Sequence, residues 1–102
     1  MRRGEVRYAQ VGRKRRPVLV LTRTEVLDVR ELVTVAKITT ALRGLAVEVA
    51  LDHEAVGLDR PSAVNCDGLH TVRQSSLTDA VGVVDDDVLD DVCAAVTLAV
   101  GW

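Results

Sequence analysis

The sequence predicts a small, mainly β domain that ends in a single α-helix. Valine supplies about one in five of the 102 residues, and β-branched residues favour strands. Short apolar or alternating segments recur between glycine, proline and charged residues, which indicates five to seven short, mostly antiparallel strands. Only the last segment has apolar residues at helical spacing. We therefore expect one domain, residues 1–102, in which the strands curl into a small barrel and the helix packs on it.

The first half of the chain contains three predicted strands. Residues 4–9 alternate between polar and apolar side chains, as in a half-buried strand. Pro17 begins the next strand, and the apolar run 18–22 suits a central position in the sheet. Residues 23–31 are charged and predict a loop, and residues 32–38 predict the third strand. That strand has Val33, Val35 and Lys37 on one face and Thr34, Ala36 and Ile38 on the other.

The second half begins with Gly44, which interrupts the chain before a strand over residues 45–51. Glu48 is the only charge in that strand. Residues 52–60 predict a loop with room for one helical turn. Further short strands are predicted at 62–66, 71–74 and 80–84.

The C-terminal helix is predicted after the acidic run Asp85, Asp86 and Asp87. Carboxylates at a helix N-terminus accept hydrogen bonds from free N–H groups and interact favourably with the helix dipole. Gly101 is expected to end the helix. The apolar positions at helical spacing are Val88, Leu89, Val92, Ala95, Val96 and Ala99.

Composition excludes several classes of protein. Hydrophobic residues make up 48% and charged residues 27%, so the chain is neither disordered nor membrane-spanning. No hydrophobic signal region opens the chain, and we expect a cytoplasmic protein with no membrane partner. Cys66 and Cys93 lack metal-ligand spacing and are expected to be buried free thiols. No metal or cofactor motif is present, and we expect neither.

Charge is distributed unevenly along the chain. Residues 1–16 carry a net charge of +6 and residues 74–102 one of −6, although the whole chain carries only −2. Gly12 and the cations that follow it are expected to form a short connection, with Arg13, Lys14, Arg15 and Arg16 directly before Pro17. Such a basic cluster at the end of a strand suits phosphate binding.

The chain has no Phe, and its only aromatic residues are Tyr8 and Trp102. Most proteins that bind single-stranded nucleic acid stack bases on aromatic side chains. If this protein binds RNA, arginine and polar groups must make most of the contacts. Tyr8 and Trp102 are expected to be anchors of the core or of a dimer interface.

Polar residues lie at the ends of several predicted strands and form a candidate site. Arg16 precedes the second strand, Thr39 and Thr40 follow the third, and residues 65–67 follow the fifth. An arginine and a threonine around one phosphate stabilise the charge that develops on phosphorus during cleavage. Without a metal, the economical nucleophile is the neighbouring 2′-OH, which restricts the substrate to RNA. Taken alone, the same residues fit a strand-end threonine and a surface ion equally well.

Four motifs resemble the MazF/PemK/Kid toxins of bacterial toxin–antitoxin modules. They are RRGEV at 2–6, RRPVLVL at 15–21, VAKIT at 35–39 and VNCDGLHT at 64–71. The resemblance covers nearly the whole chain. It implies a homodimer of SH3-like barrels of the CcdB/PemK type. It also implies a metal-independent, sequence-selective endoribonuclease that cleaves single-stranded RNA to a 2′,3′-cyclic phosphate and a 5′-hydroxyl, neutralised by a cognate MazE-like antitoxin.

By motif, the resemblance assigns the catalytic roles to Arg16 and Thr39 and base contacts to Asn65 and Asp67. The Kid branch carries an Arg in place of Asn65 and uses that Arg with the Asp as acid and base, so Asn65 favours the Arg16/Thr39 scheme. Many relatives carry a long loop before the Arg-Pro pair, and this chain has only five residues there. The remaining predicted RNA contacts are Arg13, Lys14, Arg15, Thr40, Arg43 and His70.

Several roles and functions stay open. His70 is either a proton donor to the leaving oxygen or a surface residue, and Arg43 either contacts a phosphate or is solvated. The alternative functions are a gyrase-poisoning toxin of the CcdB type and a catalytically inactive homologue that binds RNA or antitoxin. The CcdB type ends in Trp-Gly-aliphatic, whereas this chain ends in Gly101-Trp102.

Overall fold

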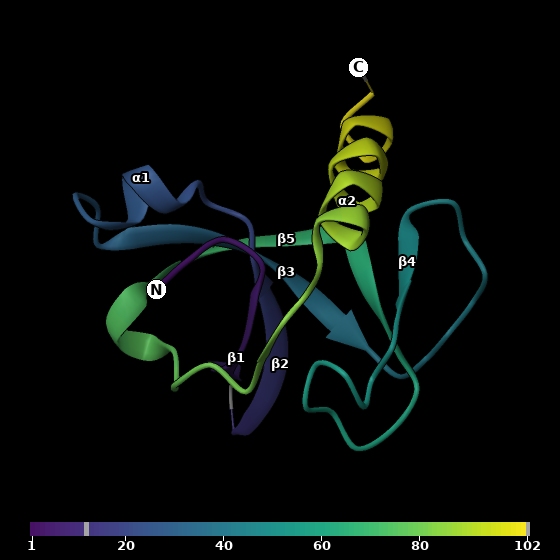
Figure 1. Ribbon diagram of the computed structural model, residues 1–102, viewed down its shortest axis with the longest axis horizontal. Coiled ribbons are helices and arrows are strands. Elements are labelled where there is room, and N and C mark those ends of the chain that lie inside the picture. Colours follow the sequence, from purple (N-terminus) through teal and green to yellow (C-terminus); the bar gives the residue numbers. More distant parts are fainter. Residues whose placement is uncertain (12, 102) are drawn as a thin grey trace.

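The computed structural model describes residues 1–11 and 13–101, except for the side chain of Val11. Six strands form one antiparallel sheet in the order β4-β5-β3-β2-β1-β6 (Figure 1). The elements are β1 (Glu5–Val11), β2 (Lys14–Val20), α1 (Thr24–Leu27), β3 (Leu32–Thr39), β4 (Glu48–Leu51), β5 (Ser62–Arg73), the 3₁₀ turn η1 (Gln74–Ser76), β6 (Gly82–Val83) and α2 (Asp86–Ala99). The predictions for Gly12 and Trp102 lie outside the described residues.

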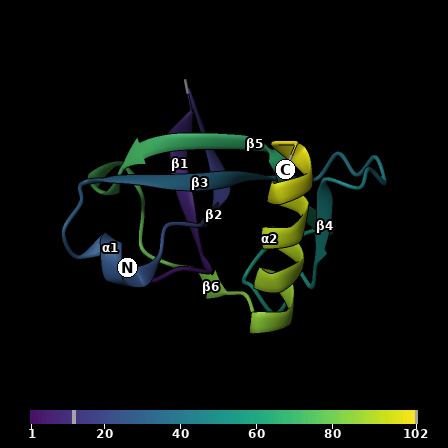
Figure 2. The ribbon, with the colours of Figure 1, turned by 90° about the horizontal axis from the view of Figure 1, so that it is seen from above.

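The sheet curls into a half-barrel, which confirms the prediction of a mainly β fold with a C-terminal helix. Figure 2 shows α2 beside the β4 end of the sheet and α1 at the opposite end. The pairing between β3 and β5 shifts register between Ala36 and Lys37, so two segments of β5 pair with β3 in different registers. Such a bulge bends a strand and re-aims its side chains.

Two clusters of buried side chains lie on opposite faces of the sheet. The face covered by α2, called the helix face below, carries Leu19, Ala36 and Val64. The opposite face carries the residues that alternate with these along the strands, such as Val18 and Val35. Period-two alternation therefore lets one strand contribute to both cores, as β2 does with Leu19 on one face and Val18 and Val20 on the other. The second cluster comprises Ala9, Val18, Val20, Leu27, Val33 and Val35.

Pro17 lies in the middle of β2 rather than at its start, so this prediction was wrong. Tyr8 is its partner on β1, and the N–H and C=O groups of Tyr8 bond Thr78 instead of β2. The Tyr8–Pro17 pair is therefore a non-hydrogen-bonded pair, and the nitrogen of Pro17 faces away from β1. The nitrogen therefore faces the β3 side of β2. Because the pairing of β2 with β3 stops at Val18, Pro17 interrupts no hydrogen bond.

Other element boundaries also differ from the predictions. The loop predicted over 23–31 contains α1, and the strand predicted over 45–51 begins only at Glu48. The strands predicted at 62–66 and 71–74 are one continuous strand, β5. The Asp67-Gly68 pair has the composition of a turn. In the structure the two residues stay within β5, at the place where its register against β3 shifts.

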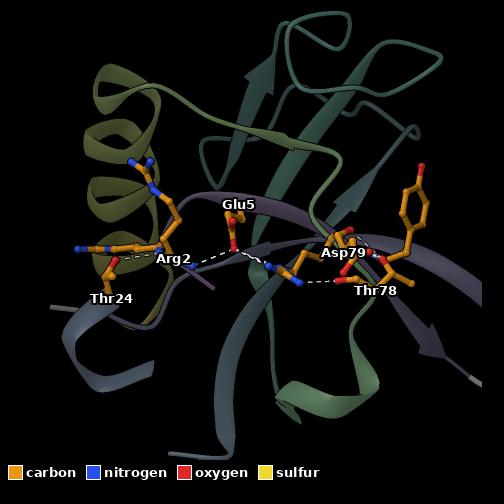
Figure 3. Close-up of polar contacts among 8 residues, drawn as sticks. Arg2, Glu5, Thr24, Thr78 and Asp79 are labelled. Atoms are coloured by element: carbon orange, nitrogen blue, oxygen red, sulfur yellow. Dashed lines mark hydrogen bonds and ion pairs between the residues drawn. The ribbon is translucent and has the colours of Figure 1, made fainter. Parts of the chain in front are cut away.

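A polar network joins β1 to the segment that leads into β6 (Figure 3). The Arg7 guanidinium donates to Glu5 Oε1 at 2.9 and 3.1 Å and to the Thr78 carbonyl at 2.7 Å. The Arg2 N–H donates to the same Glu5 oxygen at 2.8 Å. Burial raises the pKa of Glu5, but the hydrogen bonds from Arg2 and Arg7 outweigh it, and the pKa is lowered overall. The RRGE segment therefore stabilises the fold.

The helix α2 begins and ends as its sequence predicts. Asp85 is the N-cap, and its carboxylate accepts a hydrogen bond from the Val88 N–H at 2.9 Å. Gly101 follows the helix with a φ of +82°, a conformation that favours glycine. Among the described residues, no helix is long and apolar enough to span a membrane.

Candidate functional site

The ends of β2 and β3 bring two of the predicted residues together. The last pair between these strands is Val18 with Lys37, and the same register continued by two residues places Arg16 across from Thr39. Both strands alternate, so these side chains continue the face that carries Val18 and Val35. Toward this end of the sheet that face changes from buried valine to charged and polar residues.

A hollow of about 450 Å³ lies at this position. Its lining residues come from the start of β2, the end of β3 and the middle of β5. Arg16 is exposed, whereas Lys37, Thr39 and Asn65 are half-buried. The lining residues are Arg16, Lys37, Ile38, Thr39 and Asn65. This polar hollow thus contains both predicted catalytic residues and one of the predicted base contacts.

A second hollow of about 320 Å³ adjoins the polar hollow and shares Arg16 and Lys37 with it. Three of its other lining residues are valines, one each from β2, β3 and β5, and His70 lies at its wall. We call it the valine hollow; it is lined by Ala9, Gln10, Arg16, Val18, Val35, Lys37, His70, Thr71 and Val72. The two cations therefore stand where a polar and an apolar hollow meet.

Local hydrogen bonds fix the polar side chains of the site. The Thr39 hydroxyl oxygen accepts a hydrogen bond from the Ala41 N–H at 3.0 Å, which leaves the hydroxyl proton free to be donated. Asn65 Oδ1 accepts from the Asp67 N–H at 3.1 Å. Its amide NH₂ group is the remaining donor. The site thus presents donors and cations, the complement of a phosphodiester.

Glu48 organises the loop that follows β3. Its carboxylate accepts hydrogen bonds from the N–H groups of Arg43 at 2.9 Å and Leu45 at 3.3 Å. The Arg43 Nε also lies 3.7 Å from Glu48 Oε2. The Arg43 N–H, with further help from Leu45, lowers the pKa of Glu48. The single charge in the predicted strand therefore holds the chain just beyond Thr39.

The structure does not bring all predicted RNA contacts to the polar hollow. Arg13 and Lys14 are exposed at the end of the β1–β2 hairpin. Arg15 lies on the helix face, where its guanidinium stands 5.8 Å from the centre of the Tyr8 ring. Tyr8 packs against the core, as predicted. Seven of the predicted RNA contacts are exposed and lie outside the polar hollow: Arg13, Lys14, Arg15, Thr40, Arg43, Asp67 and His70.

Lys37 is the site residue that sequence reasoning did not select. It lines both hollows, and within the described chain its ammonium group has no ion-pair or hydrogen-bond partner. Its signal in the sequence was a lone cation two residues before Thr39, on the same face of an otherwise apolar strand.

Neither cysteine lies in the site. Cys66 is buried, as predicted, whereas Cys93 is exposed on α2, so the prediction for Cys93 was wrong. Among the described residues, no group of three or more His, Cys, Asp or Glu side chains is placed to hold a metal ion.

Comparison with solved structures places the fold among the MazF toxins. It superposes on the Mycobacterium tuberculosis toxin MazF-mt6 with a TM-score of 0.87 and 38% identity, covering 94% of this chain and 95% of that one. A mycobacterial endoribonuclease solved in complex with its cognate antitoxin gives a TM-score of 0.89 at 23% identity, covering 99% and 95%, and supports the fold alone.

The chain belongs to the PemK-like, MazF-like toxins of type II toxin–antitoxin systems, whose family profile matches residues 2–100. Two relatives come from Mycobacterium tuberculosis. Endoribonuclease MazF3 is 48% identical over 69 residues, which is 68% of this chain and 66% of that protein's length. The probable endoribonuclease MazF5 is 38% identical over 96% of this chain and 91% of its own length. These matches confirm the resemblance that the motifs indicated.

Proposed function

We propose that this protein is an endoribonuclease toxin that cleaves single-stranded RNA without a metal ion. The observation that carries the proposal is the placement of Arg16 and Thr39 in one polar hollow at the diverging ends of β2 and β3. The names of its relatives as endoribonucleases give independent support. The homodimer and the cytoplasmic location implied by the family remain part of this proposal.

The proposed reaction is attack of the RNA 2′-oxygen on the adjacent phosphorus. A P–O bond forms to the 2′-oxygen, the bond to the 5′-oxygen breaks, the 2′-OH loses its proton and the leaving 5′-oxygen gains one. Arg16 binds the non-bridging oxygens and stabilises the negative charge that grows on them. Thr39 donates its hydroxyl proton to the same group, since its oxygen already accepts from Ala41. The products are a 2′,3′-cyclic phosphate and a 5′-hydroxyl.

RNA contacts outside the reacting group are assigned by position. Asn65 shares the polar hollow and offers its amide to a base edge or sugar. Asp67 and His70 follow Asn65 along β5, and Thr40 and Arg43 lie on the loop beyond Thr39. Arg13 and Lys14 extend the basic surface along the hairpin, whereas Arg15 contributes from the other face.

The decisive experiment is cleavage of a long single-stranded RNA in EDTA by the wild type, Arg16→Ala and Arg30→Ala. Arg30 is an exposed arginine just before the start of β3, at the end of that strand away from Thr39, and it serves as the matched control. We expect discrete cuts with 5′-hydroxyl ends, a loss of roughly 10²-fold or more in Arg16→Ala, and normal activity in Arg30→Ala. Intact RNA with a folded wild type would favour gyrase binding or an inactive homologue. Normal cleavage by Arg16→Ala would refute the mechanism.

A further inference from the structure

We propose that Lys37 and Arg16 together bind one backbone phosphate of single-stranded RNA, and that the valine hollow beside them receives the base of the neighbouring nucleotide. The inference rests on the proposed function and adds to it a second cation and a base subsite. It follows from how the two hollows meet at Arg16 and Lys37.

The two hollows have only Arg16 and Lys37 in common. Neither side chain has an ion-pair or hydrogen-bond partner among residues 1–11 and 13–101. Two uncompensated cations at one junction favour a bound anion, and a phosphodiester is the anion that recurs between successive bases of RNA. A phosphate held there leaves one neighbouring nucleotide over each hollow.

The backbone around Lys37 directs its side chain to this junction. The register shift of β3 against β5 falls between Ala36 and Lys37. On β5, a Cβ atom at Gly68 would lie 3.4 Å from Lys37 Cδ and 3.3 Å from Asn65 Nδ2. The lack of a side chain at Gly68 therefore lets Lys37 and Asn65 pack closely over β5. A half-buried lysine stem held in this way loses less rotamer entropy when its ammonium binds phosphate.

The valine hollow has the character of a base subsite. Its volume of about 320 Å³ falls at the lower end of the roughly 300–1,000 Å³ typical of small-ligand pockets. Val72 offers an apolar wall to a base, the buried Val18 and Val35 form the floor beneath it, and His70 offers a polar edge. Tyr8 cannot supply a stacking surface here, since it packs into the helix-face core. Valine side chains would thus replace the aromatic platform that the composition lacks.

The first test measures binding of a 2′-O-methyl RNA, which has no 2′-OH to attack, by the wild type, Lys37→Gln and Arg30→Gln. Loss of one charged phosphate contact should weaken binding about 10-fold or more in Lys37→Gln. It should also flatten the slope of log K against log salt by about 0.7. Arg30→Gln should bind like the wild type. Equal binding by Lys37→Gln and Arg30→Gln would overturn the inference.

The second test replaces one nucleotide of the same RNA at a time with an abasic residue. Because the valine hollow would remove one base from water, one abasic position should weaken wild-type binding about 5-fold or more. Val72→Phe, which fills the valine hollow, should lose that dependence, whereas Val29→Phe at an exposed site should keep it. A wild type indifferent to every abasic position would refute the base subsite, whether or not Val72→Phe folds.

These outcomes are separable from the proposed function. Cleavage by the wild type together with Lys37-independent binding would refute this inference alone. Lys37-dependent binding without any cleavage of unmodified RNA would refute the endoribonuclease alone. A folded wild type that binds no RNA would refute both.

Discussion

At the scale of single residues, the site depends on which atoms are already satisfied. Thr39 uses its hydroxyl oxygen to accept from Ala41, and Asn65 uses its carbonyl oxygen to accept from Asp67. Both side chains therefore keep a donor at the polar hollow, beside Arg16 and Lys37, whose charges have no ion-pair partner in the part of the chain that the structure describes. A strand end that presents only donors and cations selects an anionic substrate.

Thr39→Val tests the donated proton with little change in shape. We expect cleavage of single-stranded RNA to fall about 10-fold to 10²-fold, because one hydrogen bond to the developing charge is lost. The melting temperature should change little, since Thr39 is half-buried at a strand end. Thr97→Val on α2 is the matched control, and its cleavage rate should equal that of the wild type. Equal rates in both variants would remove Thr39 from the mechanism.

The two thiols should differ in reactivity. Burial raises the pKa of Cys66 to about 11, whereas Cys93 is exposed and lies 2.9 Å from an Arg3 nitrogen. Since the thiolate is the reactive form, a thiol reagent at pH 8 should label one cysteine rapidly in the native protein and two after denaturation. Cys93→Ser should abolish the rapid phase. Two rapid phases in the native wild type would contradict the burial of Cys66.

At the scale of elements, hydrophobic patterning predicted most of the sheet and the helix. Alternation located β1 and β3, and the Asp-rich cap and Gly101 located α2. Hydrophobic patterning could not predict that β5 continues through Gly68. The continuation depends on a register shift in the pairing of β5 with β3, and a pattern within one strand does not reveal it. The same limit hid Lys37, whose position between the two hollows depends on its packing over Gly68 of β5. Motif resemblance supplied Arg16 and Thr39, while pattern alone left them ambiguous.

The loop between β3 and β4 should be sensitive to acid through Glu48. Its pKa is lowered in the folded protein, so its contribution to stability is present above the ordinary value of 4.5 and is lost as the pH falls below it. Glu48→Gln should therefore reduce the free energy of unfolding at pH 7, and the difference from the wild type should shrink toward pH 3. Urea unfolding across this range measures both.

Glu54→Gln, at an exposed position of the loop before β5, is the control for Glu48→Gln. It should unfold like the wild type at each pH. A difference between Glu48→Gln and the wild type that is constant from pH 7 to pH 3 would show that shape, rather than charge, explains the effect of Glu48.

At the scale of the whole molecule, the sheet separates the acidic start of α2 from the polar hollow. The acidic residues lie at the start of α2, which packs on the helix face. The polar hollow continues the opposite face of the sheet. Not all N-terminal cations are free, because Arg7 is paired with Glu5 and Arg15 lies over Tyr8. Arg13, Lys14 and Arg16 remain exposed near the site, and their field would draw an anionic chain toward it.

The same basic surface predicts how an antitoxin would act on this protein. We expect an acidic and apolar antitoxin segment to cover the polar hollow and exclude RNA, with an affinity that falls as salt rises. The double variant Arg13→Gln/Lys14→Gln should bind the segment about 10-fold more weakly in low salt and show a flatter salt dependence.

The matched double variant is Arg30→Gln/Arg73→Gln, which removes two exposed cations near the opposite ends of β3 and β5. Its net charge equals that of Arg13→Gln/Lys14→Gln, so any difference between the two reports position rather than total charge. We expect the matched variant to bind the antitoxin segment like the wild type at every salt concentration. Equal weakening of both variants would mean that net charge alone attracts the antitoxin, and an affinity independent of salt would exclude electrostatic competition for the site.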